Sequence, residues 1–184
     1  MTPAAAIETR KGTIVFTDLS GFTEFTALRG DAAALSLLDL QDRLVREQMG
    51  ASGRIVKNLG DGLMLWFDEA LDAIQVSIAL QERFEEASGE DDEPLWVRIG
   101  IHFGSPVLRG NDFIGHDVNV AARIVQTAGP GEVLASAVTV AEAHEAVGAC
   151  HFEEIGPVVM KGLPEPVPLF RVERARHSGD GSPG

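Results

Sequence analysis

The stretch GRIVKNLGDGLMLWF, residues 53 to 67, most restricts what this chain can fold into. It holds two short apolar runs on either side of Gly60-Asp61-Gly62, and an Asp-Gly pair between such runs is a strong hairpin signal. The sequence therefore predicts two adjoining strands with Asp61 at or near the tip. Lys57 lies on the first of these strands, so the hairpin carries two opposite charges that need an explanation.

The N-terminal half of the chain predicts strands and helices in alternation. The β-branched and aromatic run GTIVFTDL predicts a strand that ends in Asp18, and Ser20 after it suits the start of a helix. The spacing of apolar residues predicts two longer amphipathic helices. Strict alternation in LWVRIGIHFG predicts a half-buried strand. The ranges are 12–19 for the first strand, 33–49 and 69–86 for the helices, and 95–104 for the alternating strand.

The C-terminal half continues with shorter elements. We expect a return strand and turn over 105–115, a helix over 116–128 closed by Gly129, a strand in GEVLAS, a short helix around 138–146, a strand near 151–155 and a closing strand over 167–172. This order predicts an α+β fold with a ferredoxin-like βαββαβ core. Its mostly antiparallel sheet would be covered by helices on one face, with a small C-terminal β-α-β-β extension.

Length and composition favour one compact domain. The chain has 184 residues, 45% of them hydrophobic, which is enough for a substantial core. We expect a single domain over 11–173, an N-terminal tail or linker remnant over 1–10, and a disordered C-terminal tail over 174–184, which has no apolar anchor.

The charge disfavours two classes of partner. A formal net charge of −13 repels nucleic acid and anionic membranes, and no basic stripe offsets it. The acidic segment EEASGEDDE, residues 85 to 93, has the composition of a solvated loop. No apolar run approaches the roughly 20 residues needed to span a bilayer. We therefore expect a soluble, cytoplasmic protein with neither nucleic acid nor membrane as a partner.

Asp18 and Asp61 are candidates for binding metal. If their strands are neighbours, the two carboxylates meet at one edge of the sheet, where hard oxygen ligands favour two divalent cations, Mg²⁺ or Mn²⁺. The alternative is that Asp18 is only a helix cap and Asp61 only a turn residue. Backbone amides at the following helix start could hold phosphate oxygens. These amides belong to Ser20, Gly21, Phe22 and Thr23.

Asn119 and Arg123 form a second candidate pair. They are spaced i, i+4 on a predicted helix whose other positions are apolar, so both project from one edge. An amide beside a forked guanidinium suits a sugar and a phosphate. A solvated surface pair is the alternative.

Six blocks together resemble the catalytic domains of class III nucleotide cyclases. They are FTDLSGFTEF, KNLGDG, RIGIHFG, NDFIGHDVNVAARI, GPGEVLAS and MKGLPEPVPLFRV, and they occur in the family's order over about residues 10 to 173. The resemblance implies that Asp18 and Asp61 bind metal, with the carbonyl of Leu19 as a further ligand. It also implies that Lys57 and Asp112 recognise the adenine edge.

The same resemblance assigns the remaining residues and the reaction. Asn119 would orient the ribose, Arg123 would stabilise charge on the α-phosphate, and Lys161 would bind the triphosphate. The implied reaction converts ATP to 3′,5′-cyclic AMP and pyrophosphate with two divalent cations. Since the family draws its metal-binding aspartates from one subunit and the other groups from its partner, the resemblance implies a homodimer with two composite active sites.

Two other functions remain open. A guanylate cyclase is disfavoured because Lys57 and Asp112 have the chemistry of an adenine site. A non-catalytic nucleotide-binding or dimerisation module of the same fold would be expected to lose the metal aspartates or the arginine, and this chain keeps them.

Overall fold

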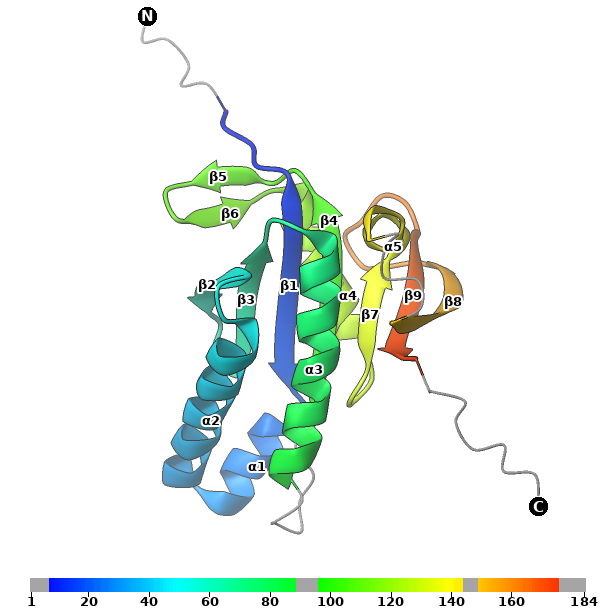
Figure 1. Ribbon diagram of the computed structural model, residues 1–184. Helices are drawn as coiled ribbons and strands as arrows, with labels where there is room; N and C mark the ends of the chain where they lie inside the picture. Colours follow the sequence, from blue (N-terminus) through cyan, green and yellow to red (C-terminus); the bar gives the residue numbers. More distant parts are fainter. Residues whose placement is uncertain (1–6, 89–95, 144–148, 176–184) are drawn as a thin grey trace, which may run out of the picture.

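The computed structural model describes residues 7–88, 96–143 and 149–175, which form a layered α+β fold (Figure 1). Its main sheet has seven strands in the order β2-β3-β1-β4-β7-β9-β8. Their bounds are β1 Gly12–Leu19, β2 Gly53–Asn58, β3 Gly62–Phe67, β4 Val97–Gly104, β7 Val133–Ser136, β8 Cys150–Val158 and β9 Val167–Arg174. Strands β4 and β7 are parallel, and every other neighbouring pair is antiparallel. The mostly antiparallel sheet and the β-α-β-β extension are thus confirmed.

Five helices pack on this sheet within the described residues. They are α1 Phe22–Arg29, α2 Asp31–Met49, α3 Ala70–Ser88, α4 His116–Thr127 and α5 Ala137–Glu142. The alternation of β1 explains the layers, because Val15 and Leu19 face a cluster that includes α2 and α3, while Ile14 and Phe16 face α4. In Figure 1, α2 and α3 lie in front of the sheet and α4 lies behind it.

Helices cover both faces of the sheet, so two of the sequence-based expectations are wrong. The sequence predicted helices on one face and a half-buried β4, but α4 covers the second face, so Gly100 and His102 are buried as well. The alternation itself holds, since Ile99 and Ile101 point toward α3. A Cβ added to Gly100 would lie 2.3 Å from the Val125 amide nitrogen, so glycine is needed here for α4 to approach the strand.

The segment expected to hold a return strand and turn forms a small hairpin of its own. Strands β5 Val107–Arg109 and β6 Asp112–Ile114 form a two-stranded sheet, and an isolated bridge joins Val107 to Thr9. Gly110, with φ 62°, makes the turn. Asp112 is therefore the first residue of β6, next to that turn.

Several expected segments fall partly outside the described residues. The predicted C-terminal tail begins at Arg174, which belongs to β9, and 176–184 lie outside the described part of the chain. The acidic segment 85–93 begins as the last turn of α3, and 89–95 are likewise not described. Of the helices in the described ranges, none has the length and apolar character to cross a membrane.

Candidate active site

Asp18 and Asp61 lie together at one end of the sheet. The register of β1 with β3 pairs Asp18 with Gly62, the residue that follows Asp61. The Leu19 amide donates to the Asp61 carbonyl oxygen at 3.2 Å, which ties the hairpin loop to the end of β1. Burial and then the negative charge of Asp18 raise the pKa of Asp61. The structure therefore brings the two predicted metal ligands close enough to repel each other.

Arg98 on β4 is the partner of Asp18. Its Nε donates to Asp18 Oδ2 at 2.9 Å, and Nη2 donates to the same oxygen. The two side chains are 31% and 23% exposed, so this ion pair is largely shielded from water. Sequence reasoning gave Arg98 no role. The alternation in 95–104 placed it on the polar side of its strand, but only the register of β1 with β4 sets it opposite Asp18.

A buried glutamine supports the loop that carries Asp61. Gln41 on α2 is 2% exposed, and its Nε2 donates to the Asp61 carbonyl and to Thr17 Oγ1, both at 3.3 Å. Thr17 Oγ1 also accepts from the Leu63 amide at 3.2 Å. Sequence reasoning missed Gln41 too. The signal was a glutamine within the apolar stripe of an amphipathic helix.

The carboxylate pair fits a divalent cation. The described residues contain no group of three or more His, Cys, Asp or Glu side chains suited to a metal, so the protein offers two carboxylates here. Leu19 packs in the core and its side chain has no oxygen, so its backbone carbonyl is the one group it could offer to a cation. Mg²⁺ in phosphoryl-transfer enzymes commonly takes one or two carboxylates and completes its shell with substrate phosphates and water. The donor set matches that pattern.

In the predicted phosphate-binding segment, the amide of the first residue, Ser20, is not free to bind phosphate. Helix α1 begins at Phe22 after Gly21, whose φ is 73°, and no side chain caps it. The Ser20 amide donates to the Trp96 carbonyl at 2.9 Å, so this amide already has a partner. Ser20 Oγ is buried with no hydrogen-bond partner among the described residues. The amides of Gly21, Phe22 and Thr23, at the start of α1, remain the candidates for phosphate.

Lys57 and Asp112 form the second part of the site. Lys57 Nζ donates to Asp112 Oδ2 at 2.8 Å, and the side chains are 37% and 40% exposed. Partial burial raises the pKa of Asp112, but hydrogen bonds from Lys57 and from the Phe113 amide outweigh it and leave the pKa below its usual value. An ammonium donor and a carboxylate acceptor thus lie side by side.

A β-bulge and an aromatic stack hold this pair. The register of β2 with β3 shifts between Ile55 and Lys57, so Lys57 pairs with Met64, which faces the α4 side of the sheet. On the β5–β6 hairpin, Phe113 is fully buried, with its ring stacked 4.1 Å from that of Trp66. The bulge and the aromatic stack therefore hold Lys57 and Asp112 on the same side of the sheet as α4.

Asn119 and Arg123 lie on the outer side of α4. Asn119 is exposed, and Arg123 Nη1 donates to Gln126 Oε1 at 2.7 Å. Arg123 Nη2 is 4.0 Å from where a Cβ would stand on Gly162, so the guanidinium lies against the turn that also carries Lys161. The structure therefore brings Lys161 to the same side as Arg123.

These residues form separate groups within one chain. Across the described residues, no hydrogen bond or ion pair joins Asp18 or Asp61 to Asn119 or Arg123. The sheet-facing side of α4 is apolar, with Ala121 and Val125 in the core, whereas the two polar side chains lie on its other side. Asp18 lies instead at the end of β1, paired with Gly62 of β3 and Arg98 of β4, and Asp61 lies in the loop just before β3.

Comparison with known proteins identifies the class. A sequence profile described as the adenylate and guanylate cyclase catalytic domain matches residues 5–173. An uncharacterised protein of Mycobacterium tuberculosis is 32% identical over 174 residues, which are 92% of this chain and 44% of that protein. A pH-sensitive adenylate cyclase of the same species is 31% identical over 176 residues, 94% of this chain and 43% of its own.

A solved structure shows the same fold. The crystal structure of the adenylyl cyclase CyaB from P. aeruginosa superposes with a TM-score of 0.79 at 25% identity, covering 92% of this chain and 97% of that one. The fold is that of the class III nucleotide cyclases. The chain belongs to the family of adenylate and guanylate cyclase catalytic domains. It spans less than half the length of the two curated relatives described above.

Proposed function

We propose that this chain is the catalytic domain, over residues 11–173, of an adenylate cyclase that converts ATP to 3′,5′-cyclic AMP and pyrophosphate. The observation that carries the choice of ATP is the contact between Lys57 and Asp112. Adenine offers a ring nitrogen that accepts and an exocyclic amine that donates, which suits a lysine beside a carboxylate. A guanine site must donate to O6 and accept from N1 and N2, so this pair suits guanine poorly.

The ribose 3′-oxygen attacks the α-phosphorus, and the bond from that phosphorus to the bridging oxygen of pyrophosphate breaks. The 3′-hydroxyl proton is lost in the process, and no protein nucleophile is needed. Asn119 orients the ribose, and Arg123 stabilises the negative charge that develops on the α-phosphate. Asp18, Asp61 and the Leu19 carbonyl would hold two divalent cations, Mg²⁺ or Mn²⁺. Bound there, the cations would lower the pKa of the 3′-hydroxyl and neutralise charge on the triphosphate.

Arg98 belongs to the same proposal. Without a cation, its guanidinium compensates the charge of Asp18. Once Asp18 serves as a ligand, the guanidinium becomes available at the end of β1, which the phosphate-binding segment directly follows. A forked donor that stays charged suits phosphate oxygens. Arg98 and Lys161 would then share the triphosphate.

A complete site requires two chains. The separation of Asp18 and Asp61 from the outer side of α4 supports a homodimer in which each site takes its metal ligands from one chain. The partner supplies Lys57, Asp112, Asn119, Arg123 and Lys161. A symmetric dimer of this kind has two equivalent sites.

The activity is tested by incubating purified protein with ATP, and in parallel with GTP, in Mn²⁺ or Mg²⁺ and quantifying cyclic nucleotide by mass spectrometry. We expect cyclic AMP that disappears in Asp18→Ala. Cyclic GMP as the main product would favour a guanylate cyclase. A dimer that forms no cyclic nucleotide from either substrate would favour the non-catalytic module.

The base assignment is tested separately by the double variant Lys57→Glu with Asp112→Gly. We expect the preference for ATP over GTP to fall by at least about tenfold, because two hydrogen bonds to the base are lost. Unchanged rates with both nucleotides would remove the base-recognition role.

A further inference from the structure

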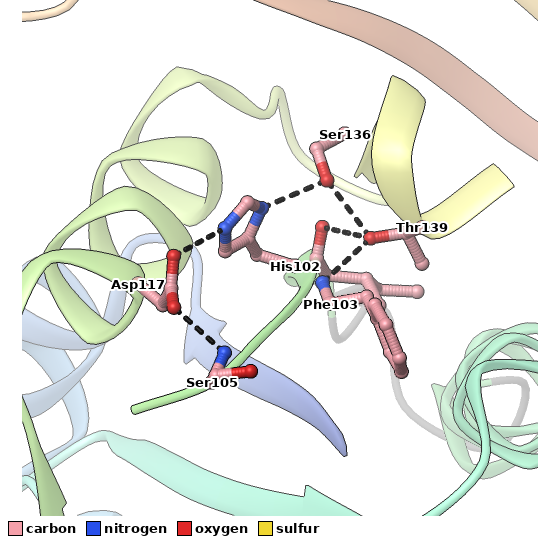
Figure 2. Close-up of polar contacts among 7 residues, drawn as sticks. His102, Phe103, Ser105, Asp117, Ser136 and Thr139 are labelled. Atoms are coloured by element: carbon pink, nitrogen blue, oxygen red, sulfur yellow. Dashed lines mark hydrogen bonds and ion pairs between the residues drawn. The ribbon is translucent and has the colours of Figure 1, made fainter. Parts of the chain in front are cut away.

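A buried polar cluster joins β4 to α4 and α5 (Figure 2). It lies near the end of β4, whereas Arg98, the partner of Asp18, lies near the start of that strand. At the centre of the cluster is His102 on β4, 8% exposed. Its Nδ1 lies 2.8 Å from Ser136 Oγ and its Nε2 lies 3.1 Å from Asp117 Oδ1. We call His102, Asp117, Ser136 and Thr139 the His102 network. None of its members has a role in the mechanism above.

The network has a consistent direction of donation from His102 to Asp117. As a carboxylate, Asp117 only accepts, and its Oδ2 already accepts from the Ser105 amide at 2.8 Å. His102 Nε2 must therefore carry the proton, and in the neutral ring, which burial favours, Nδ1 accepts from the Ser136 hydroxyl. Ser136 Oγ lies 2.9 Å from Thr139 Oγ1, and the Thr139 hydroxyl has a second acceptor in the Ile101 carbonyl oxygen at 3.4 Å. Thr139 Oγ1 accepts from the Phe103 amide at 2.9 Å, so every group is satisfied.

Asp117 connects the His102 network to α4, the helix that carries Asn119 and Arg123. It lies in the first turn of α4, where a negative charge also suits the helix dipole. A Cβ added to Gly104 would lie 2.5 Å from Asp117 Oδ2, so the strand and the first turn are in close contact. Gly100 makes the matching contact with Val125 near the other end of α4. These two contacts hold both ends of α4 against β4.

We propose that His102, as the Nε2–H tautomer, is a positioning residue that fixes the first turn of α4 through Asp117 and so aims Asn119 and Arg123. The inference rests on the proposed function, in which these two residues meet the ribose and the α-phosphate. Displacement of a catalytic group by about 1 Å can cost roughly 100-fold in rate. A histidine that only filled the core would affect stability and leave the kinetics of the folded enzyme unchanged.

Two substitutions separate these roles. His102→Gln keeps an amide N–H that can reach Asp117, whereas His102→Asn is too short to reach it and can contact only Ser136. We expect His102→Asn to lower kcat by about 10- to 100-fold with less than about a threefold change in KM for ATP, because Arg123 acts mainly in the transition state. His102→Gln should recover kcat to within about fivefold of the wild type.

Ser136→Ala is the matched control for loss of the other hydrogen bond. It removes the hydroxyl from Nδ1 but leaves the link from His102 to Asp117 in place. Its kcat should stay within about threefold of the wild type. A loss as large as that of His102→Asn would overturn the inference, since the whole cluster rather than the link to α4 would then matter.

Two measurements need no turnover. Nitrogen NMR of histidine-labelled wild type should show a protonated Nε2 and an unprotonated Nδ1 for His102 at neutral pH, and the opposite tautomer would contradict the assignment. Amide hydrogen exchange across 119–123 should be faster in His102→Asn than in the wild type or His102→Gln. Equal kcat and equal exchange in all three would overturn the inference and leave the proposed function intact. A wild type without cyclase activity would overturn the proposed function. The exchange rates would then still test whether His102 holds the first turn of α4 in place.

Discussion

The surroundings of Asp18 stabilise its negative charge, whereas those of Asp61 destabilise it. Arg98 compensates Asp18, whereas burial, followed by the charge of Asp18, raises the pKa of Asp61. A raised pKa means that the folded state favours the protonated carboxyl, so Asp61 supports folding at low pH. That contribution is lost as the pH rises through the folded-state pKa. At neutral pH and without metal, the ionised Asp61 therefore opposes folding.

Asn substitutions at these positions should have opposite effects on stability. In EDTA at pH 7.5, Asp61→Asn should match or exceed the wild type in free energy of unfolding, since it removes a repelled charge. Asp18→Asn should be less stable because Arg98 loses its partner. Both variants should lack cyclase activity. Denaturant titration with an activity assay checks this, and destabilisation of Asp61→Asn beyond Asp18→Asn would contradict it.

His102 should make stability depend on pH. Burial lowers the pKa of His102 from its ordinary value of 6.5, aided by nearby His116 and opposed by the hydrogen bond and charge of Asp117. The folded state thus favours the neutral ring. Its stabilisation is complete above about pH 6.5 and is lost as the pH falls through the lower folded-state pKa. The unfolding midpoint between pH 7.5 and 5 should fall more in the wild type than in His102→Gln, and parallel curves would refute this.

At the scale of elements, the site depends on how α2 holds the β2–β3 hairpin. Gln41 is the polar contact between them, with one hydrogen bond to the Asp61 carbonyl and one to Thr17. The loop itself is short and contains Gly60, with φ 79°. Such a loop can move its carboxylate unless something fixes the backbone.

Gln41→Leu should weaken metal binding more than it weakens the fold. It keeps the side-chain volume nearly unchanged but leaves the Asp61 carbonyl with one donor fewer, so the apparent Mn²⁺ affinity should fall by about three- to tenfold at a cost in stability of about 1 kcal/mol. Thr17→Val is the control: it removes the other acceptor of Gln41, and with it the acceptor of the Leu63 amide, but leaves the bond from Gln41 to the Asp61 carbonyl. Titration with Mn²⁺ monitored by electron paramagnetic resonance measures this directly. Equal affinities in wild type and Gln41→Leu would exclude the supporting role.

At the scale of the whole molecule, the two groups of site residues are separate within one chain. Asn119 and Arg123 lie on the outer side of α4, whereas Asp18 and Asp61 lie at the end of β1 and in the loop before β3. The proposed dimer joins them across an interface, so each chain would contribute to both sites. Defects in the two groups of residues should therefore complement each other in a mixed dimer.

Mixing Asp18→Ala with Arg123→Ala tests this complementation. Each variant alone should be inactive, because both sites of its homodimer lack one group. After equal mixing and reassembly, half the dimers are mixed and each has one intact site of two, so about a quarter of wild-type activity should return. Asp18→Ala mixed with Asp61→Ala is the control and should stay inactive, because both defects affect the same group. No recovery in the first mixture, despite exchange of chains, would argue against composite sites.

The sequence by itself determined the elements and the chemistry they carry. Alternation and apolar spacing located β1, α2, α3 and β4, because burial of one face imposes these periods on any sequence. Local turn chemistry placed Asp61 in the loop between β2 and β3. The hairpin β5–β6, by contrast, was missed as a separate sheet, since pairing partners are not encoded in a three-residue strand.

Only the tertiary structure decided which of these groups meet. The register of β1 with β4 sets Arg98 opposite Asp18, and the bulge in β2 sets Lys57 on the face of Asp112. Packing of α4 on the second face of the sheet buries His102 and gives it Asp117 as a partner. Each of these contacts joins residues far apart along the chain, and a shift of one residue in register would move a side chain to the opposite face. Local sequence patterns specify periodicity, whereas register and layer order follow from the packing of the entire core.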